Sequence, residues 1–322
     1  MFGVMPKTCF LHLGLPKTAS TSFQHTCMQN KILLKTRGVI FPIFNCIAAN
    51  RNEIINHTQP IVSLFTDKPE NYRVNKEWGI YEQIEEINKS YKKQLEHYLQ
   101  CDEDLLFSGE NIYALGEAGL SKFINKIREN NFNIKAIAMI RSPYSHLCSE
   151  IQQRIKSGEY IDLISLNNSI PKSFNAKSFS QARRARILKK VLRKNISFYS
   201  FEDACSDPHG PINFMIRKLL GHESSSYVVS DIKNESLFNL PVRMANEINK
   251  VSYSCNDNKK DAESIRILAE ANLLFKSSGK FLLTQREERL VHSYINNEHK
   301  RILESTGINV PLNSIKFTTP LK

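Results

Sequence analysis

Short apolar runs alternate with longer helical stretches through the first two thirds of the chain, and this alternation limits the folds it can adopt. Each run spans four to seven residues, the usual length of a buried strand. Strands that alternate with helices predict a parallel sheet covered by helices on both faces. We therefore expect an α/β fold with five strands: Thr8–Leu13, Val39–Pro42, Asp104–Ser108, Ile134–Ile140 and Ile196–Phe201.

The last third of the chain predicts helices instead of strands. Helical spacing of apolar residues extends over Leu240–Ser254, Asp261–Phe275 and Thr284–Ser305. A chain of 322 residues can form one elaborate domain or two, and no Pro- or Gly-rich linker marks a boundary. We expect one domain over residues 1–322, with an α/β core over 1–222 and a mainly helical extension over 223–322.

The chain carries a net positive charge, and a large part of it lies in one segment. Hydrophobic residues make up 41% and charged residues 24%, a composition that excludes intrinsic disorder. The net charge is +12, and Ala182–Asn195 alone contains seven Lys or Arg and no acid. That segment predicts a surface helix with a solvated cationic side, or one that attracts an acidic glycan or a nucleotide. No RNA-binding signature accompanies it, so we expect no nucleic acid partner.

Cysteine spacing and hydropathy exclude other classes of protein. The seven cysteines include no C-x-x-C pair, which argues against a zinc site or a disulfide framework and predicts reduced, mostly buried thiols. No window reaches the ~18 apolar residues of a membrane span, and the amino terminus lacks a secretory pattern. We expect a cytoplasmic protein without a transmembrane segment.

Residues Gly14–Thr21 lie between the first predicted strand and a helix. Such a loop gathers backbone N–H groups at the positive end of the helix dipole, where a phosphate binds well. The pattern differs from the nucleotide-triphosphate loop because Lys17 comes early and no Gly-Lys pair follows. Taken alone, the segment is equally compatible with a simple turn that contains polar caps.

The stretch His12–Gln24 resembles the 5′-phosphosulfate loop of sulfotransferases that use 3′-phosphoadenosine 5′-phosphosulfate (PAPS), in the version found in bacterial carbohydrate sulfotransferase-like proteins of the P-loop superfamily. That family has a second signature, an Arg at a strand end followed eight residues later by a Ser. Arg141 and Ser149 match it. The resemblance covers about the first 240 residues.

This resemblance implies a P-loop-type parallel sheet and the transfer of a sulfuryl group from PAPS to an acceptor hydroxyl, most readily on a carbohydrate. It assigns Arg141 and Ser149 to the 3′-phosphate and Lys17 to the bridging oxygen of the leaving phosphate, with no metal required. The 5′-phosphate would be held by the loop residues Gly14, Pro16, Lys17, Thr18, Ala19, Ser20 and Thr21. The residues that contact the adenine, and the oligomeric state, are not assigned.

Two residues are candidates for the base that deprotonates the acceptor. Glu110 follows a predicted strand directly, at the sheet edge where active sites of parallel sheets lie, although it could instead cap the next helix. His57 is the rival, because an imidazole titrates near neutral pH, although a lone His in a polar segment is more often an exposed or packing residue.

One position departs from the family pattern, which has Gly where this chain has Ala19. An Ala there would be strained if the loop demanded a positive φ, whereas a right-handed helical geometry would accept it. Two alternative functions stay open: a nucleotide-dependent kinase of the P-loop class, and a basic glycan- or nucleic-acid-binding protein without activity.

Overall fold

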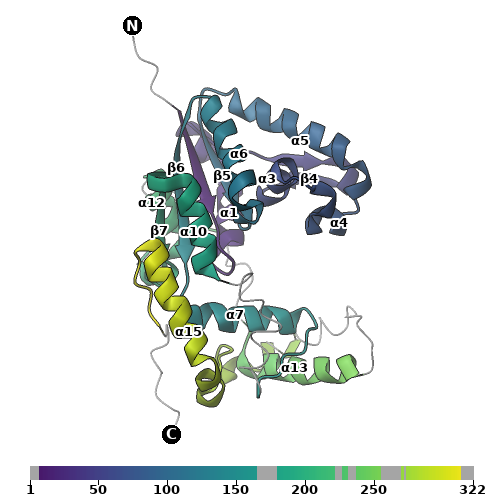
Figure 1. Cartoon of the computed structure of the whole chain (residues 1–322), viewed down its shortest axis with the longest axis vertical. Coiled ribbons are helices and arrows are strands. Elements are labelled where there is room, and N and C mark those ends of the chain that lie inside the picture. Colours follow the sequence, from purple (N-terminus) through teal and green to yellow (C-terminus); the bar gives the residue numbers. More distant parts are fainter. Residues whose placement is uncertain are drawn as a thin grey trace. The chain divides into compact units, whose positions relative to one another are not determined.

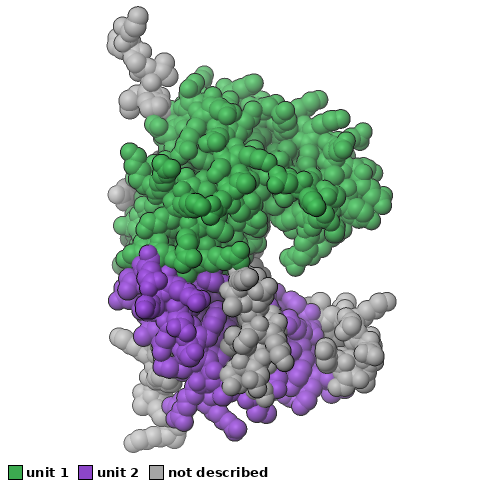
Figure 2. All heavy atoms as spheres, viewed as in Figure 1, with its two compact units in different colours: residues 1–140, 182–233, 305–308 green, residues 141–181, 234–304, 309–322 purple. Residues whose placement is uncertain are grey.

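The computed structural model describes residues 7–164, 180–221, 227–230, 237–254, 270–271 and 273–312. They form two compact units (Figure 2). Unit 1 comprises residues 1–140, 182–233 and 305–308, and unit 2 comprises 141–181, 234–304 and 309–322. The predicted division at residue 222 stays a prediction. Most of the predicted helix Asp261–Phe275, and Cys255, lie outside the described residues.

Unit 1 is built on a five-stranded sheet whose strand order is β2-β5-β1-β6-β7 and whose neighbours are all parallel. This sheet, with helices on both faces (Figure 1), confirms the predicted α/β class. The five strands, each close to its predicted position, are β1 (Lys7–Leu13), β2 (Val39–Ile40), β5 (Asp104–Gly109), β6 (Phe132–Ile140) and β7 (Ile196–Ser200).

Alternation along the strands divides the core of unit 1 between the two faces. Phe10 and Leu106 pack with Phe23 and Met215, which belong to helices on one face. On the other face Phe107 meets Phe123, their ring centroids 6.0 Å apart. The helices of unit 1 are α1 (Ser20–Gln29), α2 (Lys31–Thr36), α3 (Thr58–Phe65), α4 (Arg73–Glu77), α5 (Ile84–Leu99), α6 (Gly116–Glu129), most of α10 (Gln181–Leu192), α11 (Phe201–Ser206) and α12 (Gly210–Leu220).

The polar segment between β2 and α3 contains more regular structure than its sequence suggests. A short antiparallel hairpin, β3 (Phe44–Cys46) with β4 (Arg51–Ile54), precedes helix α3. The charged surface of the hairpin concealed it, because three of the four β4 residues are exposed.

Unit 2 is helical, which confirms the predicted character of the carboxyl region. Its described helices are α7 (Pro143–Lys156), α13 (Asn239–Ser254) and α15 (Gln285–Thr306). Tyr144 and Ile151 of α7, Val242 of α13 and Val291 of α15 share one apolar core. None of the helices in the described residues is both long and apolar enough to cross a membrane. The six cysteines among the described residues are free thiols.

Candidate functional site

The carboxyl ends of β1 and β5 bring most of the predicted site residues in unit 1 together. Leu13 and Gly109 are paired in the parallel register, and the N–H of Gly14 donates to the carbonyl of Gly109 at 3.0 Å. The loop after β1 therefore begins beside the residue that precedes Glu110. Parallel sheets place ligand sites at this edge.

Two residues of the loop after β1 have left-handed backbone conformations without being glycine. Lys17 has φ +67° and Ala19 has φ +60°. Such a conformation costs about 1–2 kcal/mol for a residue with a side chain. The question raised by Ala19 is thus answered, since this position does demand a positive φ. Backbone strain that is kept by the surrounding structure gathers at functional sites.

The first turn of helix α1 lacks the side-chain groups that usually satisfy its backbone N–H groups. Its N-cap is Ala19, which has no side-chain acceptor, and the first turn holds no acidic residue. The first N–H groups of a helix need partners from outside the helix. Among the described residues no side chain caps this end, so its dipole and donors suit an anion.

The hydroxyl of Ser20 adds an independent sign of a ligand. Ser20 is buried, and its Oγ has no hydrogen-bond partner within the part of the chain that is described. It lies over Gly14, because a Cβ at Gly14 would stand 2.1 Å from it. A buried hydroxyl without a partner is costly, and Gly14 keeps the space beside it clear.

The remaining loop residues have different roles. The hydroxyl of Thr18 donates to the carbonyl of Leu15 at 2.6 Å and is fully buried, so this side chain braces the loop. Pro16 is buried, whereas Lys17 and Thr21 are half-buried. The backbone of the loop and the side chains of Lys17, Ser20 and Thr21 are therefore the groups that could hold a phosphate.

His12, inside β1, lies directly beneath this loop. Its Cε1 is 3.3 Å from the position of a Cβ on Gly14, and its Nδ1 is 2.8 Å from the Oγ of Ser108. Its Nε2 has no partner among the residues described. Complete burial lowers the pKa of His12 to about 3, which keeps the imidazole neutral. Nothing in the sequence pattern around His12 indicates this polar contact.

His57 is placed near the end of β5 but is held as a structural group. Its Nδ1 accepts from the N–H of Ser108 at 2.8 Å, so Nε2 carries the proton and donates to the carbonyl of Pro42 at 2.6 Å. The side chain is fully buried, and desolvation lowers its pKa to about 4. Both nitrogens are thus engaged and away from solvent, an arrangement that favours the packing role over that of a base.

Glu110 occupies the position expected of a base at the carboxyl end of β5. It is half-buried, and the next residue is anchored because the N–H of Asn111 donates to the Oγ1 of Thr58 at 3.1 Å. Glu110 precedes the short helix that begins at Ile112 and does not belong to it. Of the two candidate bases, it is the one with access to solvent.

Arg141 and Ser149 belong to unit 2. Arg141 directly follows β6, and its backbone is fixed by the buried side chain of Gln181. The N–H of Arg141 donates to Oε1 of that amide at 2.9 Å, and its carbonyl accepts from Nε2 at 2.8 Å. Ser149 is half-buried on α7, whose first residue is Pro143. Arg141 thus lies at the end of β6 and Ser149 on the helix that follows it.

No group of three or more His, Cys, Asp or Glu side chains that could hold a metal ion occurs among the described residues.

The comparisons with known proteins give little beyond this geometry. No family model matches the chain, and no curated protein matches it. The crystal structure of a sulfotransferase from Alicyclobacillus acidocaldarius is similar over 81% of this chain and 100% of that chain, with 14% sequence identity and a TM-score of 0.39. The α/β class of this chain rests on the observed parallel sheet.

Proposed function

We propose that this protein is a sulfotransferase that moves a sulfuryl group from PAPS to a hydroxyl group of a carbohydrate. The observation that carries the proposal is the start of helix α1, where strained backbone, uncapped N–H groups and a buried Ser20 hydroxyl meet over Gly14. These features fit a bound 5′-phosphate. The resemblance of His12–Gln24 to a phosphosulfate loop supplies the identity of the donor.

The loop would act by binding and by stabilising charge. The N–H groups at the start of α1 and the hydroxyls of Ser20 and Thr21 hold the 5′-phosphate. Bound PAPS supplies the sulfuryl group, whose departure leaves negative charge on the phosphate oxygen. Lys17 provides a fixed positive charge for that oxygen. Preorganised charge of this kind is usually the largest single contribution to catalysis.

Glu110 would accept the proton of the acceptor hydroxyl. It lies at the sheet edge next to the phosphate loop, because Gly109, the residue before it, accepts a backbone hydrogen bond from Gly14 of that loop. His57 is left out of this mechanism because both of its ring nitrogens are engaged. Its contacts with Ser108 hold the end of β5 in place, and Glu110 follows two residues later.

Arg141 and Ser149 would recognise the 3′-phosphate, which distinguishes PAPS from ATP. This assignment rests on the sequence resemblance. Arg forms strong charge-assisted hydrogen bonds with phosphate, so the assignment predicts a specific loss of affinity when the guanidinium is removed.

Titration calorimetry with 3′-phosphoadenosine 5′-phosphate, the product of PAPS, and with Mg-ATP tests the proposal. We expect the former to bind more tightly, and Arg141→Ala to weaken it by at least about tenfold. Arg154→Ala is the matched control, because that Arg is paired with Glu159 on the same unit and should change the affinity by less than about twofold.

The other outcomes discriminate the alternatives. A preference for Mg-ATP would favour a kinase, and indifference to both nucleotides would favour a binding protein. A screen of labelled sulfate transfer onto a panel of glycans then tests the acceptor class. Transfer confined to phenols or other small alcohols would remove the carbohydrate from the proposal.

A further inference from the structure

Helix α13 of unit 2 exposes four apolar side chains, while its buried side carries two amides beside the apolar Val242 and Ala245. Leu240, Met244, Ile248 and Val251 are between 41% and 65% exposed. At 100° per residue these positions fall on one side of the helix. We call these four residues the α13 stripe. A helix on a protein surface normally directs such a stripe to the core, so this one is arranged for a second contact.

The opposite side of α13 is tied to the unit through amides. Asn246 is buried and bonds both the N–H and the carbonyl of Ile161, at 2.9 and 2.8 Å. The side chain of Asn249 donates to the carbonyls of Ile155 and Glu159 at 2.8 and 3.0 Å. These four hydrogen bonds fix the rotation of the helix about its axis. The α13 stripe therefore cannot turn inward without leaving buried amides unsatisfied.

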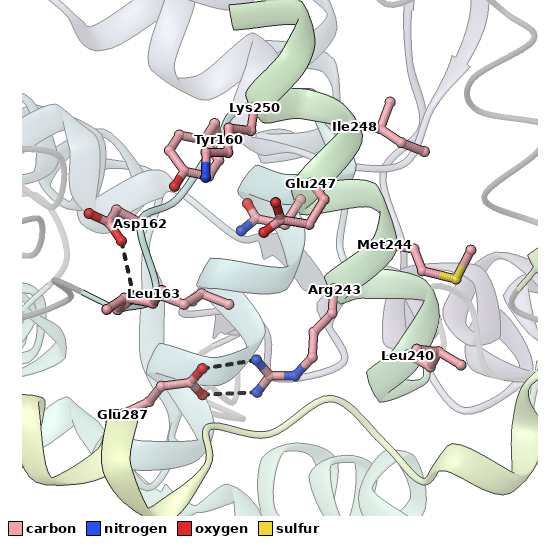
Figure 3. Close-up of a pocket in the computed structure, with 12 residues that line it drawn as sticks. Tyr160, Asp162, Leu163, Leu240, Arg243, Met244, Glu247, Ile248, Lys250 and Glu287 are labelled. Atoms are coloured by element: carbon pink, nitrogen blue, oxygen red, sulfur yellow. Dashed lines mark hydrogen bonds and ion pairs between the residues drawn. The ribbon is translucent and has the colours of Figure 1, made fainter.

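A groove of about 580 Å³ runs beside the stripe (Figure 3). Figure 3 shows Leu240, Met244 and Ile248 projecting from one side of α13, with Tyr160 and Leu163 on the other side of the helix. All five line the groove. Ile164, at the rim, is 75% exposed. Four apolar side chains exposed on one side of a helix, next to a groove, are typical of an interaction site.

Five charged residues line the groove: Asp162, Arg243, Glu247, Lys250 and Glu287. Arg243 and Glu287 neutralise each other with two contacts of 2.9 Å, so this pair belongs to the unit itself. Glu247 and Lys250 are both exposed, and the ammonium of Lys250 lies 5.7 Å from the centre of the Tyr160 ring. By helical geometry Glu247 and Lys250 lie on the same flank of the stripe.

This charge pattern is complementary to itself. When two copies of a helix pair antiparallel about a two-fold axis, the same flank of each helix meets, and every contact from one residue to another occurs twice. An acid and a base three residues apart on one flank then face each other reciprocally. Apolar seams flanked by such charges are how helices select their partners and orientation.

We propose that the α13 stripe is the contact between two copies of this chain, with the helices antiparallel about an axis near Ile248. In this arrangement Met244 faces Val251 of the second copy, and Glu247 reaches Lys250 of the second copy on both sides of the axis. The exposed apolar side chains of the α13 stripe are then buried in the dimer. The proposal does not depend on the proposed activity.

Sedimentation equilibrium under reducing conditions, which keep the exposed Cys205 from linking copies, measures the association. We expect a reversible dimer whose dissociation constant is below roughly 100 µM. The double variant Met244→Glu with Ile248→Glu should raise the dissociation constant at least about 100-fold, because it places four carboxylates in the contact. The matched control is Ile32→Glu with Ile47→Glu, at exposed apolar positions of unit 1, and it should leave the constant unchanged.

A charge swap distinguishes this contact from any other apolar association. Glu247→Lys and Lys250→Glu should each raise the dissociation constant by roughly tenfold, because each brings like charges together twice. The double swap should return it to within about threefold of the original value. A monomer at every concentration, a dimer insensitive to Met244→Glu with Ile248→Glu, or a double swap that fails to restore association would overturn the proposal. A helical circular dichroism spectrum and an unchanged melting temperature show that each variant is folded.

Discussion

Helices α1 and α11 both follow a strand of the same parallel sheet, but their first turns are completed differently. At α11 the Oγ of Ser200 accepts from the N–H of Asp203 at 3.1 Å, and Glu202 and Asp203 place negative charge in the first turn. At α1 the N-cap is Ala19, and neither a side-chain cap nor an acid is present among the described residues.

Two helices that follow strands of one sheet thus differ in whether their own side chains satisfy the first turn. The start of α11 is satisfied by its own side chains and needs nothing from outside. The start of α1 instead combines two left-handed residues with a buried hydroxyl that has no partner. An anion would satisfy the N–H groups, the dipole and the hydroxyl together, which is why we assign the phosphate to α1 and not to α11.

The largest expected effect comes from removing the charge at the α1 junction. Lys17→Ala should lower the rate of sulfate transfer by about 10³-fold, because the leaving phosphate loses its fixed positive partner. The rate is measured with labelled donor and the acceptor found in the glycan screen. Lys31→Ala, which removes an exposed Lys just after the same helix, should retain the full rate. Equal losses of rate in the two variants would mean that Lys17 contributes only to the overall positive charge of the protein and has no specific role at the leaving phosphate.

The two ends of strand β5 give the next comparison. Glu110→Gln should lower turnover by about 10²-fold, because the acceptor loses its base, and should leave the affinity for 3′-phosphoadenosine 5′-phosphate nearly intact. Glu103→Gln, just before the other end of the strand, is the control and should be neutral in both measurements. A fully active Glu110→Gln enzyme would place the base elsewhere.

Removing the hydroxyl should change the free energy of unfolding in opposite directions at Ser20, in the first turn of α1, and at Ser200, the N-cap of α11. Ser20→Ala should raise the free energy of unfolding by about 1 kcal/mol, because a buried hydroxyl without a partner is removed, and should weaken nucleotide binding about tenfold. Ser200→Ala should lower the free energy of unfolding by about 1 kcal/mol through loss of its cap and leave binding unchanged. Urea unfolding and calorimetry measure both quantities. Destabilisation by Ser20→Ala would mean that the hydroxyl has a structural partner.

The smallest expected effect concerns backbone strain. Ala19→Gly should raise the free energy of unfolding by up to about 1 kcal/mol, because Gly adopts a positive φ without the penalty of a Cβ. Asn131→Gly is the matched control, since Asn131 also has a positive φ but Asn tolerates it. A loss of stability in Ala19→Gly greater than that in Asn131→Gly would show that the loop is not strained at this position.

The parts of the fold that could be predicted are those whose signal is local. Strand β6 is such a part, because Ile134–Ile140 is almost continuously apolar. The hairpin β3–β4 was not anticipated, since its strands are short and largely exposed. Short polar strands are stabilised by their pairing, which a sequence does not reveal.

The candidate site was predictable in its location but not in its detail. The strand–loop–helix pattern placed Gly14–Thr21 at the sheet edge, as observed. The sequence left the backbone conformation of Ala19 open, and the structure shows it to be left-handed. Both ring nitrogens of His57 bond to the backbone of distant segments, at Pro42 and Ser108, so residue type and spacing could not distinguish a base from a packed imidazole.

The central claim is that an anion binds at the start of α1, and backbone amide resonances report directly on such binding. In a titration of isotope-labelled protein with 3′-phosphoadenosine 5′-phosphate, the N–H resonances of Ser20 and Thr21 should shift progressively and saturate with the calorimetric affinity. The resonance of Asp203, at the capped start of α11, should stay in place. Saturable binding that leaves Ser20 and Thr21 unmoved would contradict the account.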